Sequence, residues 1–404
     1  MRGLLLIGVG WIAAGLSAAP PDSVQSLKEY LKRPADQRLA MPAEIRQLTL
    51  TRKQVEPVAD GLWEDHIRQL RQERAKEMRE KVIRHGKLSM RFDFVVYGDK
   101  PKNGRSLYIS MHGGGNVPAR LNDSQWENQK RLYRPKEGVY LAPRAPTNTW
   151  NLWHQGHIDP MFMRLIENLV ALQDVNPNRV YLMGYSAGGD GVYQVAPRMA
   201  DSLAAAAMMA GHPNETSPVG LRNLPFAIHV GEHDRGFNRN RVAAEWGNQL
   251  AALRKADPKG YVHHVQIHAG RGHWMNREDA MAVEWMARHT RHPLPKLIVW
   301  RQDDVVHRDF YWLSLPEGQA KAREEIRATV EEQQIKITGP AGRRIEVNLK
   351  DQLIDLDQPV VIIGNGKELY RGNVFRTAGQ LWDSLTQRRD REFLFPAQVE
   401  VMLP

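Results

Sequence analysis

One short segment, Val180–Gly191, constrains the fold of this chain more than any other part of the sequence. It begins with an apolar run suited to a buried strand, passes through a Gly-x-Ser-x-Gly pattern at Gly184–Gly188, and continues into a helix-compatible stretch. Such a junction forms a strained turn that exposes the serine hydroxyl, and small residues two positions on either side avoid a collision across it. The N–H groups of the following helix then face developing negative charge. The segment predicts a strand–turn–helix unit with Ser186 as a candidate nucleophile.

A second motif precedes this one. Leu107–Met111 reads as a strand and runs directly into His112-Gly113-Gly114-Gly115. A strand followed by His-Gly-Gly-Gly, upstream of the serine turn, supplies backbone N–H groups to half of an oxyanion hole in lipases and esterases. Glycines are needed because no Cβ may stand between those N–H groups and a carbonyl oxygen. A glycine-rich turn without this role is the alternative, and the serine turn downstream favours the oxyanion loop.

An acidic partner is expected after the serine in the chain. Pro225–Gly231 is another strand-like run, and Glu232-His233-Asp234 follows it. A carboxylate just past the end of such a strand is where the third catalytic residue belongs. Asp234 is the choice, and Glu232 is its rival. Ordinary loop carboxylates are the structural alternative for both residues.

The remaining partner is a histidine. Val262–His268 reads as a strand, and a glycine-flanked loop, residues 269–275, follows it with His273 at its centre. We predict His273 as the general base, because its place along the chain follows the expected order. The histidines of the strand are expected to be packed or surface residues; they are His263, His264 and His268.

With these motifs in hand, the chain resembles the α/β-hydrolase superfamily. Within it, the stretch Asn176–Gly189 and the Gly272-His273-x-Met275 loop are similar to the secreted branch of polyhydroxybutyrate depolymerase-like, feruloyl esterase-like and predicted-peptidase proteins. The resemblance covers roughly residues 90–293. Many depolymerase-like members have a disulfide in the oxyanion segment, whereas this chain has no cysteine. That departure puts the substrate subfamily in doubt and leaves the chemistry intact.

The resemblance implies a fold, a site and an activity. The fold is a mostly parallel sheet covered by helices, in agreement with the strand–helix alternation of residues 106–290. The implied catalytic triad is Ser186, Asp234 and His273, with oxyanion donors at Gly113, Gly114 and Ala187. The reaction is hydrolysis of a carboxylic ester through an acyl-enzyme, on polyester or hydroxycinnamoyl esters in this branch. A serine peptidase with the same triad is the alternative, and a non-catalytic binding protein is disfavoured because every catalytic position is filled.

The expected substrate pocket rests on weaker patterns. Trp150 and Trp153 lie in a loop after a predicted strand, where they would form an aromatic wall or, alternatively, a buried anchor for the loop. The other residues expected to border the pocket are His112, Tyr185, His212 and Trp274. The pair His154 and His157 lacks a third ligand, so we expect no metal and no cofactor.

Composition adds an expected location and partners. Residues 1–19 have a positive start, an apolar stretch and small residues at the end, which is typical of a secretory signal peptide; an uncleaved anchor is the alternative. We therefore expect a secreted or periplasmic protein without stable membrane insertion. The net charge of +10 is spread along the chain with no Lys/Arg-rich block, which argues against a nucleic-acid partner and leaves a small or polymeric ester as the expected one.

The chain of 404 residues is too long for one compact core. We expect a helical N-terminal extension over residues 20–87, a catalytic domain over 88–293 and a small β-rich domain over 294–404. In the extension, prolines including Pro57 should interrupt short helices, before a charged helix over Trp63–Arg84. The last domain should contain one helix, at about residues 318–332, and serves either to brace the hydrolase or to hold a polymer.

Overall fold

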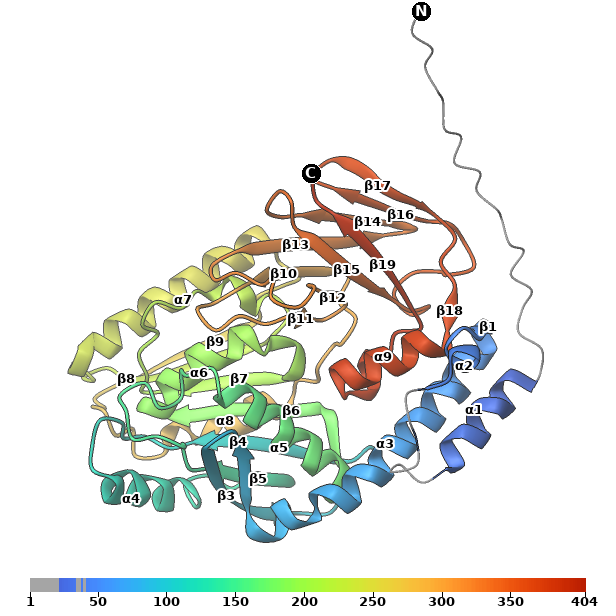
Figure 1. Ribbon diagram of the computed structural model, residues 1–404. Helices are drawn as coiled ribbons and strands as arrows, with labels where there is room; N and C mark the ends of the chain where they lie inside the picture. The colour runs from blue at the N-terminus through green and yellow to red at the C-terminus, as the bar shows by residue number, and fades with distance from the viewer. Residues whose placement is uncertain (1–21, 34–37, 39–40) are drawn as a thin grey trace, which may run out of the picture.

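The computed structural model describes residues 22–33, 38 and 41–404 (Figure 1). The expected signal peptide, residues 1–19, lies outside these residues. Within the described part of the chain, no helix combines the length and the apolarity needed to cross a bilayer.

The centre of the molecule is an eight-stranded sheet with the strand order β2-β3-β5-β4-β6-β7-β8-β9. Pairing is antiparallel from β2 to β3 and from β3 to β5, and parallel between all later neighbours. The strands are β2 Val82–His85, β3 Leu88–Tyr97, β4 Arg105–Met111, β5 Gly138–Pro143, β6 Val175–Tyr185, β7 Ala205–Met209, β8 Phe226–Gly231 and β9 His263–His268. Because β4 lies beside β6, the loops that leave their carboxyl ends meet at one edge of the sheet.

Helices cover both faces of this sheet. Apolar residues of α5, α6 and α7 pack on one face, and α8 packs on the other. The strands between them read as continuous apolar runs because both of their faces are buried. The helices are α4 Ala119–Gln129, α5 Ile158–Gln173, α6 Ala187–Arg198, α7 Arg239–Ala256 and α8 Met281–Ala287. The predicted α/β-hydrolase fold is confirmed.

The C-terminal part of the chain is β-rich, as expected (Figure 1). One five-stranded sheet has the order β10-β13-β14-β16-β17, and one four-stranded sheet has the order β11-β12-β15-β19. The strands of the first are β10 Leu297–Arg301, β13 Glu325–Glu331, β14 Gln334–Thr338, β16 Val360–Gly364 and β17 Lys367–Gly372. Those of the second are β11 Asp309–Phe310, β12 Leu313–Ser314, β15 Arg344–Leu349 and β19 Ala397–Met402.

The prediction of a helix at residues 318–332 is wrong. Glu325–Glu331 forms β13, in which buried and more exposed side chains alternate, and this period of two matches a strand. The helix of this region is α9, Ala378–Arg388, begun by the Thr377 hydroxyl, which accepts a hydrogen bond from the Gln380 N–H.

The N-terminal segment consists of α1 Asp22–Lys32, α2 Ala43–Arg46, the short strand β1 Thr49–Leu50 and the long helix α3 Arg52–Glu80. β1 pairs with β18, Arg376–Thr377, in the C-terminal part. The expected interruption at Pro57 is wrong, because α3 runs through it. The expected helix end at Arg84 is wrong as well: Lys81 adopts a left-handed conformation that ends α3, and the residues after it join the central sheet as β2.

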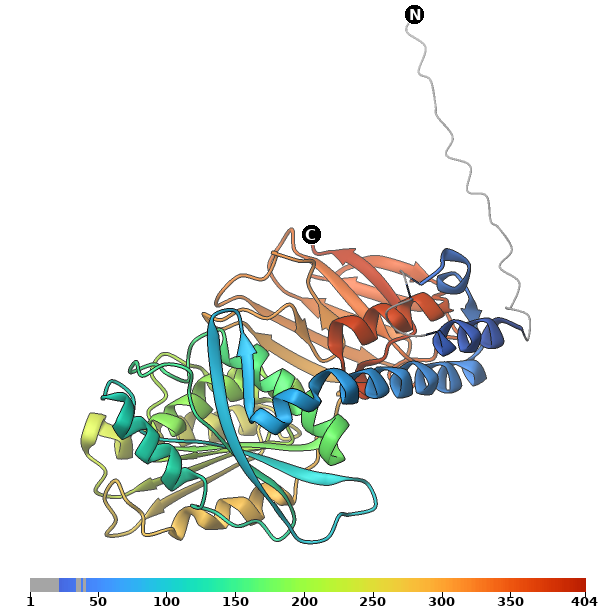
Figure 2. The ribbon, with the colours of Figure 1, turned by 60° about the horizontal axis from the view of Figure 1, so that its bottom comes forward.

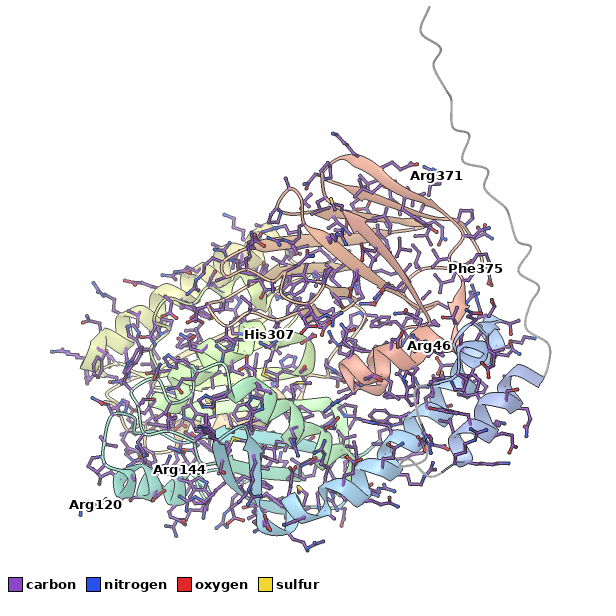
Figure 3. The ribbon with its side chains drawn as sticks, viewed as in Figure 1. Arg46, Arg120, Arg144, His307, Arg371 and Phe375 are labelled. Carbon is purple, nitrogen blue, oxygen red and sulfur yellow. The ribbon has the colours of Figure 1, made fainter. Side chains whose placement is uncertain are left out.

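The three parts of the chain pack against one another. Figure 2 shows α3 running from the side of α9 to the central sheet. One hydrophobic cluster continues from the central sheet into the C-terminal strands. Between them, His307, labelled in Figure 3, lies 2.7 Å from Asp159 of α5, and Arg388 of α9 lies 2.5 Å from Asp201. The C-terminal strands thus bury apolar and ionic groups against the sheet, as a brace would.

Candidate active site

Ser186 lies at the turn between β6 and α6. Its φ of 58° and ψ of −120° are strained for a residue with a side chain, and strain of this kind collects at functional sites. The turn is tight enough to require its two glycines. A Cβ on Gly184 would lie 2.2 Å from the Gly188 carbonyl oxygen, and one on Gly188 would lie 2.1 Å from that of Met111. The turn therefore holds the Ser186 hydroxyl at the start of α6.

Three side chains from separate loops form a hydrogen-bonded chain. The Ser186 Oγ–H donates to His273 Nε2 at 3.0 Å, and the His273 Nδ1–H donates to Asp234 Oδ2 at 2.8 Å. Asp234 is 2% exposed, whereas the His273 side chain is 45% exposed. The acid is thus shielded while the serine end of the chain is open to a substrate. This is the arrangement of nucleophile, base and orienting acid that acyl transfer uses.

Glu232 has a different role from Asp234. Its Oε2 accepts a hydrogen bond from the Gly270 N–H at 2.8 Å, and its side chain is exposed. It therefore ties the β8 turn to the start of the histidine loop. The structure brings Asp234, and not Glu232, to His273.

Tyr185 holds the loop that carries His273. Its hydroxyl donates to the His273 carbonyl oxygen at 2.7 Å and accepts from the Met275 N–H at 3.1 Å. Its ring lies edge-on to the His273 ring, with centroids 6.0 Å apart. Tyr185 was expected to border the substrate pocket. It borders the cleft, but its polar group is engaged by the histidine loop.

The His-Gly-Gly-Gly loop leaves β4 beside the serine. A Cβ on Gly113 would lie 3.2 Å from Ser186 Cβ, and the Gly115 N–H donates to Asn122 Oδ1 of α4. No hydrogen bond within the described part of the chain uses the N–H groups of Gly113 or Gly114. Ala187 opens α6, and the first N–H groups of a helix have no partner within it. Unengaged donors therefore border Ser186 on two sides.

Two residues expected in the pocket are buried instead, which corrects their predicted role. His112 is fully buried: its Nδ1–H donates to the Gly113 carbonyl and its Nε2 accepts from the Ala145 N–H. Burial lowers the pKa of His112 to about 3, so the ring is neutral. Trp153 is also fully buried, and its indole N–H donates to the His112 carbonyl. Both side chains hold the His-Gly-Gly-Gly loop from behind, and neither is among the lining residues of the cleft described next.

A cleft of about 730 Å³ opens above Ser186. One wall comes from α4 and the residues after it, and the other from the His273 loop. The lining residues are Gly113, Gly114, Val117, Leu121, Gln125, Asn128, Gln129, Arg131, Leu132, Tyr185, Ser186, His273, Trp274 and Arg277. Trp274 is thus on the cleft as expected, whereas Trp150 and His212 are not among its lining residues. Among the residues that the structure describes, the lining includes two arginines and no acidic side chain.

The α4 wall was missed by the sequence prediction. Its signal was the position of the segment, soon after the glycine loop, together with apolar Leu121 between the polar residues Arg120 and Asn122. Leu121 is 46% exposed and Trp274 is 49% exposed, so apolar surface faces the cleft from both sides.

Two charged residues behind the triad were missed as well. Asp190, one turn after Ser186 on α6, accepts a hydrogen bond from the His212 N–H at 2.7 Å. Burial raises the pKa of Asp190 to about 6. Arg239, at the start of α7, has its Nη1 3.9 Å from Asp234 Oδ1. Asp190 and Arg239 thus connect Asp234, α6 and the loop after β7.

The histidine pair His154 and His157 lies in the segment just before α5. His154 is buried beneath the exposed Trp150, with ring centroids 5.4 Å apart. Within the described residues, neither His154 nor His157 belongs to a group of three ligand side chains close enough to share an ion.

Residues 136–291 match the model of the dienelactone hydrolase family. This segment includes Ser186, Asp234 and His273. A bifunctional acetylxylan esterase/xylanase, XynS20E of Neocallimastix patriciarum, is 27% identical over 161 residues, which are 38% of this chain and 23% of that protein. The chain therefore spans about a quarter of the length of the curated relative it matches.

Solved structures with similar folds share little sequence with this chain. The poly(3-hydroxybutyrate) depolymerase LpqC of Bordetella parapertussis is 15% identical with a TM-score of 0.38, over 52% of this chain and 87% of that one. Dipeptidyl peptidase 4 of Porphyromonas gingivalis is 13% identical with a TM-score of 0.38, over 52% and 35%. These likenesses are too distant to bear on activity. The topology of the central sheet and the serine turn are those of an α/β-hydrolase fold, and residues 136–291 within it are similar to the dienelactone hydrolase family.

Proposed function

We propose that this protein is a serine hydrolase of carboxylic esters, with Ser186 as nucleophile, His273 as general base and Asp234 as the acid that orients the base. The observation that carries the proposal is the continuous chain of hydrogen bonds from Ser186 Oγ through His273 to Asp234, at 3.0 and 2.8 Å. The family match over residues 136–291 supports the same reaction class.

The mechanism follows from the positions of these atoms. His273 Nε2 takes the Ser186 proton as Oγ attacks the ester carbonyl, and the N–H groups of Ala187 and of Gly113 or Gly114 stabilise the oxyanion. His273 then gives that proton to the leaving alcohol. In deacylation it removes a proton from water, which attacks the acyl-enzyme and releases the acid.

The lining of the cleft supports a substrate class. Apolar surface from Leu121, Leu132 and Trp274 suits an acyl or aryl group. Arg131 and Arg277 favour substrates with a negative group near the ester, because no acidic side chain lines the cleft to offset them. A secreted or periplasmic location, based on residues 1–19, is part of the proposal.

The test is the variant Ser186→Ala, with Ser89→Ala, an exposed serine on β3, as its control. Loss of the nucleophile should reduce ester hydrolysis by about 10⁴- to 10⁶-fold without changing the fold, and the control should keep full activity. A fluorophosphonate probe should label wild type at Ser186.

The substrate panel should contain short and long acyl esters, feruloyl esters, polyester film, charged and neutral aryl esters, and peptide amides. Labelling of another residue, or near-normal turnover by the alanine variant, would refute the nucleophile. Faster cleavage of amides than of matched esters would make the protein a peptidase.

A further inference from the structure

Gln125 lies beside Ser186, on α4, the helix that also carries the labelled Arg120 (Figure 3). A Cβ added to Gly113 would lie 3.2 Å from Ser186 Cβ and 3.7 Å from Gln125 Oε1. A Cβ added to Gly114 would lie 3.7 Å from Gln125 Cγ, so the side chain runs along the His-Gly-Gly-Gly loop with its amide at Gly113. Gln125 is exposed and is among the lining residues of the cleft. The serine and the amide therefore approach the same point beside Gly113.

The amide of Gln125 is not engaged by the protein. Among the residues that the structure describes, none forms a hydrogen bond with it. The last torsion of a glutamine side chain is broad and roughly two-fold, so a half-turn that exchanges Oε1 and Nε2 costs little when neither atom has a partner. The side chain thus offers two N–H donors to an acceptor placed beside Gly113.

The helix that carries Gln125 is fixed on the central sheet by two buried side chains. The Trp126 indole N–H donates to the carbonyl oxygen of Ala142 on β5 at 2.9 Å. The Gln129 Nε2 donates to Ser110 Oγ on β4 at 2.7 Å. Side chains carried by a rigid element are held more precisely than those of a loop. The backbone of Gln125 is therefore held in a fixed position relative to the strand that leads into the His-Gly-Gly-Gly loop.

Asn122, almost one turn before Gln125, joins α4 to the His-Gly-Gly-Gly loop. It is fully buried, and its Oδ1 accepts a hydrogen bond from the Gly115 N–H at 2.9 Å, while its Nδ2 donates to the Val117 carbonyl oxygen at 3.2 Å. A Cβ on Gly114 would lie 2.2 Å from Asn122 Oδ1, so helix and loop are in direct contact there. Residues three positions apart on a helix are neighbours on its surface. The contact that fixes Asn122 therefore also fixes the approach of Gln125 to the loop.

We propose that Gln125 is a catalytic residue whose side-chain N–H donates a hydrogen bond to the oxyanion, beside the backbone N–H groups of the His-Gly-Gly-Gly loop and of α6. The inference rests on the proposed function, because it takes Ser186 as the nucleophile. The oxyanion forms on the carbon that Ser186 Oγ attacks, between the serine and the loop at Gly113. Donors already in place there stabilise the developing negative charge without reorganisation, and an amide does so without a titrating group.

The test is Gln125→Met, which keeps the approximate length of the side chain and removes the amide. We expect kcat on an aryl ester to fall about 10- to 100-fold with KM changed less than about twofold, because the lost hydrogen bond strengthens as charge develops in the transition state. The rate of fluorophosphonate labelling at Ser186 should fall by a similar factor, since the phosphoryl oxygen takes the place of the oxyanion. The matched control is Gln249→Met, at an exposed glutamine of α7 outside the cleft lining, and it should behave as wild type.

A second variant, Gln125→Glu, separates a donor from a side chain that only packs against the loop. A carboxylate has nearly the same shape as the amide, but at pH 8 it has no N–H and repels the oxyanion. We expect its kcat to lie below that of Gln125→Met by a further factor of about ten or more. Because position 125 is exposed, the Tm of both variants should stay within about 2 °C of wild type, which shows that the fold is retained.

The outcomes distinguish this inference from the proposed function. Normal kcat and normal labelling in Gln125→Met, with Ser186 still the labelled residue, would overturn the role of Gln125 and leave the proposed function standing. A raised KM at unchanged kcat would overturn it too, because Gln125 would then bind only the ground state of the substrate. Equal kcat values for Gln125→Met and Gln125→Glu would reduce Gln125 to a packing residue. Wild-type protein that is not labelled at Ser186 would refute the proposed function and this inference with it.

Discussion

At the scale of single residues, three carboxyl groups in and around the site differ in their burial and in their hydrogen-bond partners. Asp234 is buried against His273, Glu232 is exposed and bound to a backbone N–H, and Asp190 is buried in the first turn of α6. The three lie near one another, yet each has a different partner. Their substitution should therefore have three different effects.

Asp234→Asn should reduce kcat by roughly 10²- to 10⁴-fold, because an amide no longer holds His273 in the tautomer that accepts the Ser186 proton. Glu232→Gln, which keeps an acceptor for the Gly270 N–H, should cost less than about threefold. Steady-state kinetics on one aryl ester compares the two variants. The opposite ranking would assign the acid to Glu232.

Asp190→Asn should raise stability in a pH-dependent manner. Burial raises the pKa of the Asp190 carboxyl in the folded protein to about 6, from its ordinary value of 3.8, so the unfolded chain loses this proton first as pH rises. The free energy of unfolding of the wild-type protein therefore falls by up to about 3 kcal/mol between about pH 4 and 6, and it stays lower above pH 6. Asparagine keeps the acceptor for the His212 N–H and avoids the buried charge.

Thermal unfolding from pH 4 to 8 should therefore show a higher Tm for Asp190→Asn than for wild type at pH 7.5, and almost no difference at pH 4. Asp99→Asn, at an exposed position, should track wild type throughout. A Tm difference independent of pH would contradict this assignment.

At the scale of elements, the site depends on contacts between loops. β6 contributes Tyr185 as well as the serine turn, and the Tyr185 hydroxyl bridges the His273 carbonyl and the Met275 N–H. His273, the proposed base, is therefore positioned by the strand that leads into Ser186. A loop held at its backbone keeps the ring of its histidine in place.

Tyr185→Phe removes this bridge and keeps the ring. We expect kcat to fall about tenfold with little change in KM, and the loss of a buried hydrogen-bond partner to cost about 1–3 kcal/mol of stability. Tyr97→Phe, at a partly buried tyrosine of β3, is the control. Unchanged kcat at an equal loss of stability would show that Tyr185 has only a structural role.

At the scale of the whole molecule, α3 connects the parts of the chain. Its first half packs with α1 and α9, and its last turns contact α5 (Figure 2). Glu77 forms the second contact: its carboxylate accepts hydrogen bonds from Arg164 at 3.0 Å and from Asn168 at 2.9 Å. The charged helix α3 thus buries two of its acids, Asp65 and Glu77.

Glu77→Ala should lower stability by about 1–3 kcal/mol, because Arg164 and Asn168 lose their partner. Catalysis at 25 °C should be unchanged, since α3 does not line the cleft. Glu73→Ala, at an exposed position on the same helix, should be neutral. Denaturant unfolding measures both variants, and equal midpoints would refute the role of Glu77.

The sequence by itself determined the features that depend on local order. The strand before Ser186, the glycines on either side of it, the glycine loop after β4 and the histidine loop after β9 each carry their signal within a few residues. The glycines of the serine turn are required for steric reasons, because Gly184 and Gly188 approach backbone atoms so closely that a side chain would not fit. The α/β-hydrolase fold could be predicted from these motifs together with the alternation of strand-like and helix-like segments.

Tertiary structure decided what depends on contacts between distant residues. Glu232 and Asp234 are two positions apart, and only the place of the histidine loop distinguishes them. His112 and Trp153 are residue types that often line pockets, yet their rings pack on each other behind the His-Gly-Gly-Gly loop. Glu325–Glu331 has the charge of a surface helix, but pairing with β10 and β14 makes it a strand, because burial of alternate side chains outweighs local preference.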